Sequence, residues 1–386
     1  MKPIKHLIAS LAISALVGCG SENDTNSDIL YGCFDSSQQT DTSVQWSKLI
    51  TENATYLSEY KLFDDASDPT KNPQASGLPY DLSVPLFTDY ASKYRFIFVP
   101  PGCSATYDAN EVFKFPIGTV LTKTFSLPSN TDNRGFENED MIETRLLILR
   151  ESGWIAMPYV WNEDKSDAKL DINGELVVTN INHDGQVLDL AYGVPDPQKC
   201  KRCHQVDGIM EAIGPKARFL NSDYAYDDST DNQLERWVSE GILSGLPEDI
   251  STIDKIPTFK DSTDIPAIPA DELQIYAKGW LDINCGHCHR PEGDASNTNM
   301  HVEWVRNFDK DKTGHGVCQL PISFGGDGSG DYIIEPGSSE RSLMVFRMNT
   351  RDGGDRMPPL GRDLIHSEGV ELVSAWIDSM PGNICN

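Results

Sequence analysis

Two five-residue segments of the chain carry cysteine and histidine at the same spacing. They are Cys200-Lys201-Arg202-Cys203-His204 and Cys285-Gly286-His287-Cys288-His289. This C-x-x-C-H pattern is the attachment signature of a c-type haem. Two thiols at this spacing can add to the two vinyl groups of one porphyrin, and the adjacent imidazole can bind the iron from the proximal side. The pattern predicts two covalently bound haem c groups, attached through the four cysteines and ligated by His204 and His289.

Chance does not account for two such segments. With 9 cysteines and 8 histidines in 386 residues, about 0.004 accidental matches are expected. The alternative chemistry for a bare C-x-x-C pair is a zinc knuckle or a redox dithiol. The repeated C-x-x-C-H pattern favours haem.

The second motif follows directly on an amphipathic segment, residues 271–284. Its apolar residues recur at helical spacing, which predicts a helix that leads into the motif: Leu273, Tyr276, Ala277, Trp280 and Leu281. A last helix is predicted with Ser367 as its N-cap, with Pro381-Gly382 after its end and with a buried face of Val370, Val373, Trp376, Ile377 and Met380. This pair of helices resembles the packed pair of a class I cytochrome c.

The class I resemblance implies a distal iron ligand in the loop before the last helix. That loop contains Met357, followed by Pro358 and Pro359, which stiffen it. Met344 and Met348 are rival methionines, but the segment 343–348 has the composition of a buried helix. Met357 is therefore the predicted distal ligand of the second haem, and a His/Met pair raises the reduction potential. His287, inside the motif, is expected to face away from that iron.

The first haem has an incomplete ligand set. Pro215 lies eleven positions after His204, where class I cytochromes place a carbonyl that accepts the outer N–H of the proximal histidine. No methionine or histidine occurs between Glu211 and Asn284, and Met210 is too close in sequence to reach the other side of the iron. The remaining candidates are a water-bound or five-coordinate iron, or one of Met141, Met157, His183, His301 and His315.

The N-terminus predicts export and lipidation. Two lysines precede a short apolar run from Leu7 to Val17, which is the length of a signal-peptide core and too short to span a bilayer. Leu16-Val17-Gly18-Cys19 resembles a lipobox, in which Cys19 is diacylated. An ordinary signal peptide with an incidental cysteine is the alternative. Because Gly20 rather than Asp follows the cysteine, resemblance to proteobacterial lipoproteins favours the outer membrane. The expected location is the periplasmic side of a Gram-negative envelope, with membrane attachment through the lipid alone.

The chain is strongly acidic, with a formal charge of −27. Removal of residues 1–18 removes two lysines and no acidic residue, which leaves 30 basic and 59 acidic residues and a charge of −29. Such a surface disfavours nucleic acid and suits docking to a basic patch on a redox partner protein. The simpler alternative is that acidity keeps an exported protein in solution.

The remaining cysteines form an even set. After Cys19 and the four haem thiols, Cys33, Cys103, Cys318 and Cys385 remain, which predicts two disulfides in an exported protein, with three possible pairings. We favour Cys33–Cys103 and Cys318–Cys385, because each pair then stays within one proposed domain.

The fold class expected is α+β with several domains. After the signal peptide 1–18, residues 19–45 are polar and predict a flexible tether. Residues 46–195 predict an all-β, sandwich-like domain with strands at 94–99, 119–125, 145–150 and 154–161 and a hairpin at Asn173-Gly174. Residues 196–262 form the first haem segment, with a helix at 232–243, and residues 263–386 the class I cytochrome c domain. The glycine-rich stretch 325–331 lacks the ligand spacing of an EF-hand and predicts a loop at the haem edge.

Nearly all of the mature chain resembles a poorly characterised family of exported dihaem cytochromes c, often lipoproteins. The likeness is carried by segments 143–147 and 158–162, by Cys200 to His204, by segments 214–218 and 232–234, and by Asn284 to Pro291 with the Met357 loop. Pro359 stands where the family pattern has Glu, a small departure. The resemblance implies haem binding and electron transfer, and it names no substrate.

The sequence is compatible with three functions. The first is an electron carrier in the periplasm, which is not an enzyme. The second is a dihaem peroxidase-like enzyme, in which an open first haem meets peroxide. The third is a module whose β domain binds a partner or polysaccharide and carries a cytochrome. Two six-coordinate low-spin haems favour the first function, and an open-coordinated haem favours the second.

Overall fold

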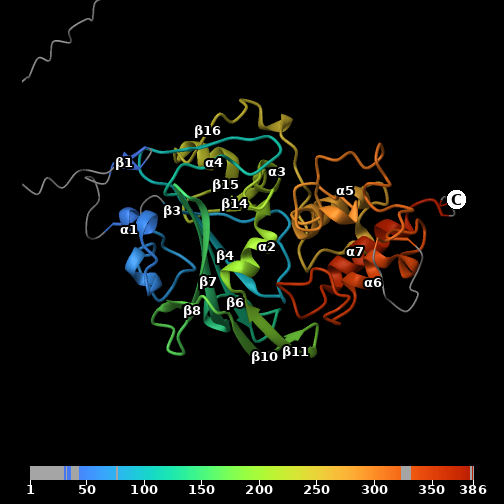
Figure 1. The fold of residues 1–386 in the computed structure, drawn as a ribbon, viewed down its shortest axis with the longest axis horizontal. Helices are drawn as coiled ribbons and strands as arrows, with labels where there is room; N and C mark the ends of the chain where they lie inside the picture. Colours follow the sequence, from blue (N-terminus) through green and yellow to red (C-terminus); the bar gives the residue numbers. More distant parts are fainter. Residues whose placement is uncertain are drawn as a thin grey trace, which may run out of the picture.

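The computed structural model describes residues 30–31, 33–35, 43–74, 77–322, 332–382 and 385. At its centre is one six-stranded antiparallel sheet, shown in Figure 1. The strands lie in the order β3 (Gly77–Pro79), β4 (Ser92–Phe98), β6 (Val120–Pro128), β7 (Glu139–Arg150), β8 (Gly153–Trp161) and β9 (Ala168–Leu170). The C-terminal helices lie at one end of the molecule, beside the sheet.

The other elements are short. The helices are α1 (Trp46–Thr51), α2 (Pro197–Cys203), α3 (Ala217–Leu220), α4 (Gln233–Ser239), α5 (Leu273–Leu281), α6 (Leu343–Met348) and α7 (Ser367–Asp378). The hairpin of β10 (Glu175–His183) and β11 (Gln186–Val194) forms a separate two-stranded sheet, and a bridge between Asn130 and Asn182 joins it to the segment after β6. Four two-stranded ladders complete the strands: β1 (Leu30–Tyr31) with β2 (Phe34–Asp35), β5 (Ala105–Thr106) with β16 (Leu243–Ser244), β12 (Gln205–Val206) with β13 (Ile209–Met210), and β14 (Asp223–Ala225) with β15 (Thr230–Asn232).

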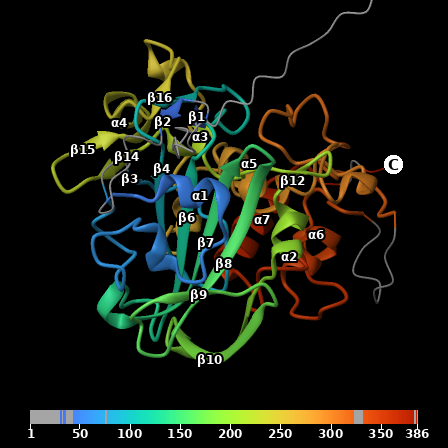
Figure 2. The same cartoon turned by 60° about the vertical axis from the view of Figure 1, so that its left-hand side comes forward.

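The predicted strands at 94–99, 119–125, 145–150 and 154–161 are confirmed as parts of β4, β6, β7 and β8. Their side chains divide between two faces, because successive residues of a strand point to opposite sides. On one face α1 and the 3₁₀ turn Leu57–Tyr60 cover the sheet, and the ring of Tyr60 packs edge-on against Tyr159 at 6.2 Å. On the other face α2 lies beside β8, as Figure 2 shows.

The α+β class is confirmed, but the expected sandwich is not formed. The structure has one large sheet, and the second layer is the β10–β11 hairpin, which covers part of one face through Ile181, Leu190 and Tyr192 against Phe125. The Asn173-Gly174 turn does not make a hairpin either. It joins β9 to β10, which belong to different sheets, and the hairpin turn is at Asp184-Gly185 instead. Turn residues predict a reversal of the chain, and pairing across it depends on what each strand packs against.

The predicted helix pair is confirmed, since α5 packs against α7. Gly369 allows the close approach, because a Cβ at this position would lie 2.5 Å from Cζ2 of Trp280. Helix α7 begins at Ser367 with His366 in the N-cap position, so the prediction of Ser367 as N-cap is wrong by one residue. The buried helix at 343–348 is confirmed as α6, and the helix predicted at 232–243 ends early, at Ser239.

Both favoured disulfides are present, Cys33–Cys103 and Cys318–Cys385. The signal peptide, Cys19, most of the tether and the glycine-rich stretch 325–331 lie outside the described residues. Among the helices in the described part of the chain, none has the length and apolar character needed to cross a bilayer.

Candidate haem-attachment site

Helix α2 carries the cysteines of the first motif. Asp196 caps the helix, its side chain accepting a hydrogen bond from the backbone N–H of Lys199 at 2.9 Å, and Pro197 occupies the first turn. Asp at the N-cap followed by Pro is a strong start signal, so the helix begins directly before the motif. The three-residue spacing places Cys200 and Cys203 on one side of the helix.

The imidazole of His204 is oriented by its own loop. Its Nδ1 lies 3.0 Å from the carbonyl oxygen of Glu211 and donates to it, which leaves Nε2 as the atom with a free lone pair. The prediction that Pro215 supplies this carbonyl is wrong, because the β12–β13 ladder folds the chain back and brings Glu211 to the ring. The Pro215 carbonyl accepts from the backbone N–H of Phe113 instead.

Burial lowers the pKa of His204 to about 4, and the positive charge of Lys123 adds to the effect. The ring is therefore neutral at pH 7, and the neutral imidazole is the form that binds a metal.

A cavity of about 500 Å³ opens beside the first motif. Cys200, Cys203 and His204 line it, and Met348 and Met357 reach it from the C-terminal part of the chain. Much of its wall is apolar, with Leu82, Leu86, Leu121, Leu147, Ile213 and Ile283 among the lining residues. Cofactor sites commonly enclose roughly 300–1,000 Å³ and have mainly apolar walls, so the cavity has the size and the surface of such a site.

The second motif continues directly from α5 through a π-helical turn, Asp282–Gly286. Asp282 is buried and pairs with the buried Arg218, with 2.7 Å between Oδ2 and Nη2, so the turn is tied to the segment that follows the first motif. The Arg218 guanidinium and Lys216 lower the pKa of Asp282 against the cost of burial. Asn284 accepts from the backbone N–H of Phe87 at 2.8 Å. The motif is therefore attached both to the first haem segment and to the strand region.

His289 resembles His204 in its surroundings. Its Nδ1 lies 3.2 Å from the hydroxyl oxygen of Thr298, and burial, with the nearby His287, lowers its pKa to about 4. Burial also raises the pKa of the Cys285 thiol to about 12. Cys285, Cys288 and His289 do not line the cavity of the first motif.

The two motifs meet although more than 80 residues separate them in the chain. The donor atoms of Cys203, His287 and Cys288 all lie within 4.8 Å of one another. Arg202 holds the segments together through an ion pair with Asp294 at 3.1 Å. Hydrogen bonding from Cys288, with a smaller contribution from His287, lowers the pKa of the Cys203 thiol. Sulfur and imidazole nitrogen are also the donor set of zinc sites, so this cluster offers a second possible chemistry.

The Met357 loop is fixed by backbone contacts. The N–H of Met357 donates to the Arg347 carbonyl at 2.8 Å, and its own carbonyl accepts from the guanidinium of Arg362 at 2.8 and 3.0 Å. His287 of the second motif lines the same cavity as Met357, so the loop lies close to the second motif. Met357 thus borders the first-motif cavity while its loop reaches the second motif. Met344, in α6, does not line the cavity.

Most other candidates for the first distal ligand lie elsewhere. Met141 is buried in the core, and His301 and His315 do not line the cavity. Met157 borders the cavity, but its sulfur lies 4.0 Å from the Tyr60 hydroxyl on the opposite face of the sheet.

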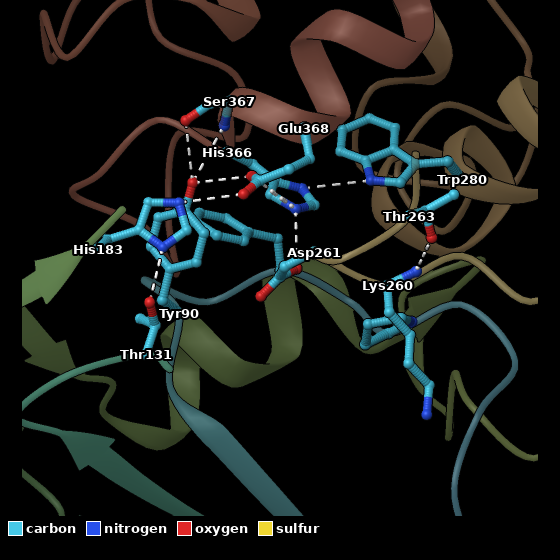
Figure 3. A network of polar contacts seen from close by, with 12 residues as sticks. Tyr90, Thr131, His183, Lys260, Asp261, Thr263, Trp280, His366, Ser367 and Glu368 are labelled. Atoms are coloured by element: carbon cyan, nitrogen blue, oxygen red, sulfur yellow. Dashed lines mark hydrogen bonds and ion pairs between the residues drawn. The ribbon is translucent and has the colours of Figure 1, made fainter. Parts of the chain in front are cut away.

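His183 has other partners. Its Nδ1 is 2.9 Å from the Thr131 hydroxyl, its Nε2 is 3.0 Å from a Glu368 carboxylate oxygen, and its ring stacks on Tyr90 at 3.9 Å. Figure 3 shows this network, in which Glu368 at the start of α7 also accepts from the Tyr90 hydroxyl at 2.9 Å. The same network fixes α7 against the strand region, so we interpret His183 as structural.

Sequence reasoning missed three cations that face the cavity from the sheet. Arg95 of β4, Lys123 of β6 and Arg145 of β7 are register partners across neighbouring strands, and all three line the cavity. We call them the cationic ladder. A signal was present in the sequence for Lys123, because no other residue of β6 is charged.

Comparison of the chain with protein-family models, with curated proteins and with solved structures finds no match.

Proposed function

We propose that the protein is a dihaem c-type cytochrome that transfers electrons on the periplasmic side of a Gram-negative envelope. The observation that carries the proposal is the juxtaposition of the two C-x-x-C-H segments, one of which opens into a cofactor-sized cavity. When bound, haem supplies one-electron redox chemistry. A pair of attachment sites in contact is what electron relay between two centres needs.

The residue roles follow from the donor atoms. Cys200 and Cys203 would attach the first haem, and Cys285 and Cys288 the second. His204 and His289 present neutral imidazoles whose Nδ1 atoms are already engaged, which suits Nε2 for the proximal bond. We assign Met357 to the distal side of the second iron, as the resemblance to class I cytochromes implies. It lines a cavity that residues of both motifs line, Cys203 and His204 of the first and His287 of the second, so the first iron is the alternative.

The position of the thiols supports direct exchange between the two centres. Because the sulfur atoms of Cys203 and Cys288 lie within 4.8 Å of each other, cofactors bonded to them are neighbours. The chain holds this arrangement with the Arg202–Asp294 pair and with a backbone hydrogen bond from Asp207 to Glu292 at 2.9 Å. Electrons that enter at one site can reach the other without a further carrier.

The acidic surface fits the same function. With a formal charge of −27, the chain favours a partner with a basic docking patch and disfavours nucleic acid. The partner is therefore a second redox protein, and attachment to the membrane is through lipid on Cys19.

The metal content and the optical and EPR spectra of the purified protein test the proposal. We expect two irons per chain, no zinc, no titratable thiol, and low-spin c-type spectra in both redox states. The second candidate is a zinc protein, favoured by the Cys203–His287–Cys288 cluster. Stoichiometric zinc with free thiols would establish it and overturn the cytochrome. A high-spin first haem that reacts with peroxide would instead identify a peroxidase-like enzyme.

The lipid anchor gives a separate prediction. Cys19→Ala should release the protein from the membrane fraction, because loss of the acyl chains leaves an acidic body with no other predicted attachment. Gly20→Asp should stay membrane-bound and move from the outer to the inner membrane fraction. Sedimentation and density-gradient fractionation measure both. A Cys19→Ala protein that still sediments with membranes would show that the anchor is something else.

A further inference from the structure

The face of the sheet that borders the first-motif cavity carries positive charge in an unusual place. The cationic ladder runs straight across three strands, with Lys123 opposite Arg95 on one side and opposite Arg145 on the other. The Arg95 side chain is only 5 % exposed. Charges at such depth are costly unless they are paired, so their partners determine what the ladder is for.

Within the described part of the chain, some hydrogen-bond donors of the cationic ladder have no acceptor. Arg145 is paired with the buried Glu143, with 2.8 Å from Nε to Oε2, and Arg95 uses Nη1 for Asp81 at 2.5 Å. Nη2 of Arg95 is buried and has no hydrogen-bond partner among the described residues. The Lys123 amine contacts the Phe125 ring, 5.3 Å from its centroid, and makes no hydrogen bond or ion pair within the described part of the chain. Burial and the neighbouring guanidinium groups hold the pKa of Lys123 well below its ordinary value, so an anion beside it would favour the charged amine.

Arg95 and Lys123 line the same cavity as the thiols and imidazole of the first motif. An anion is the ligand that an ammonium group and a guanidinium N–H would bind together, and a carboxylate matches their geometry. The described residues that line the cavity include two acids, Asp89 and Glu175. Asp89 accepts from the backbone N–H groups of Asp363 and Leu364, and Glu175 lies exposed at the start of β10. A ligand that brings its own negative charge into the cavity would complete the ladder.

We propose that the cationic ladder binds the carboxylates of the first haem, so that the β-sheet forms one wall of the haem site. The proposal rests on the proposed function, since a haem bonded to Cys200 and Cys203 carries two propionates into this cavity. It assigns a role to the strand region as part of the redox centre, in place of a separate module for partners or polysaccharides. Lys123, which has no counter-ion of its own, is the central contact.

Lys123→Met tests the proposal, because methionine keeps the length of the side chain and removes the charge. We expect two attached haems by intact mass, an unchanged spin state, and a roughly tenfold lower equilibrium constant for reduction of one haem. A tenfold change is 59 mV for a one-electron couple. The direction follows because the reduced haem carries one more negative charge and loses a stabilising cation. Lys123→Arg should restore the potential of the unmodified protein.

Lys169→Met is the matched control, because this exposed lysine lies on β9 of the same sheet and does not line the cavity. It should change neither potential. Arg95→Gln is the second variant and should lower the same potential as Lys123→Met, since its partner Asp81 is 46 % exposed and is not left buried. Arg145 is unsuitable, because its removal would leave the buried Glu143 unpaired.

Three results would overturn the proposal. Potentials of Lys123→Met and Arg95→Gln equal to those of Lys169→Met would show that the ladder does not contact the haem. A change of spin state in Lys123→Met would make the lysine an iron ligand. A potential of the unmodified protein that depends on added acetate would mean that the ladder binds a free anion. Failure of the proposed function is distinguishable, because the unmodified protein would then show no haem mass at all.

Discussion

Replacing both Cys200 and Cys203 with alanine is expected to halve the haem content, from two haems per chain to one. The thioether bonds that these thiols would form survive acid–acetone extraction and denaturing electrophoresis, so haem that remains after either treatment is covalently attached. The pyridine haemochrome assay and intact mass measure the stoichiometry. The remaining haem should be the one on Cys285 and Cys288, since their thiols lie on a separate helix and turn.

A matched control separates attachment from a general loss of structure. Cys33→Ala with Cys103→Ala also removes two cysteines from the N-terminal half of the chain, but these two form a disulfide and do not line the cavity. That variant should retain both haems, although it will be less stable. An unchanged haem content in Cys200→Ala with Cys203→Ala would show that the first motif does not attach a haem.

The parts of the fold that depend on local pattern were predictable from the sequence. Strands β4, β6, β7 and β8, helices α6 and α7, and the α5–α7 pair follow from apolar periodicity, which reflects a single buried face. The disulfides were predictable because only one of the three pairings avoids joining the N-terminal part of the chain to its C-terminal part. The sandwich was wrong because periodicity shows that a strand has a buried face and does not show which element covers it.

Only the site residues that lie within the two C-x-x-C-H motifs were predictable from the sequence. The donors of each C-x-x-C-H segment are local, and their identity needs no fold. The contact between Cys203 and Cys288 joins segments that lie more than 80 residues apart, and the sequence of neither motif indicates the other as its neighbour. The carbonyl partner of His204 was misplaced for a similar reason, since the small β12–β13 ladder shortens the path to Glu211.

The cationic ladder does not follow from the apolar residues of its strands, which indicate only that each strand has a buried face. Lys123 stands between Thr122 and Thr124, and a charged residue at such a position is usually on the solvent face. Here that face is covered by α2 and by the β10–β11 hairpin, so the same pattern marks a polar wall of a cavity. Cations that face each other on neighbouring strands could have indicated the site. Which residues face each other depends on how the two strands pair, and the sequence of one strand does not show it.

Met357→Ala is the second prediction with a large expected effect. It should abolish the far-red sulfur-to-iron charge-transfer band of the oxidised protein, because that band requires a thioether bonded to the iron. It should also lower one of the two reduction potentials, since thioether stabilises ferrous iron and water or hydroxide does not. We expect a change of about a hundredfold in the equilibrium constant for reduction, or about 120 mV at 59 mV per decade. Optical spectra and redox titration measure both effects.

Two other methionines serve as controls and as rivals. Met344→Ala and Met348→Ala each remove a sulfur buried in α6, and the band and both potentials should be retained in both variants. Met348 lines the same cavity as Met357 and is therefore the closer rival. The loop between α6 and α7 contains no other sulfur, so nothing local can replace Met357 without refolding. If Met357→Ala retains the band and Met348→Ala loses it, the distal ligand is Met348 in α6. The loop that Arg362 holds would then serve only to close the cavity.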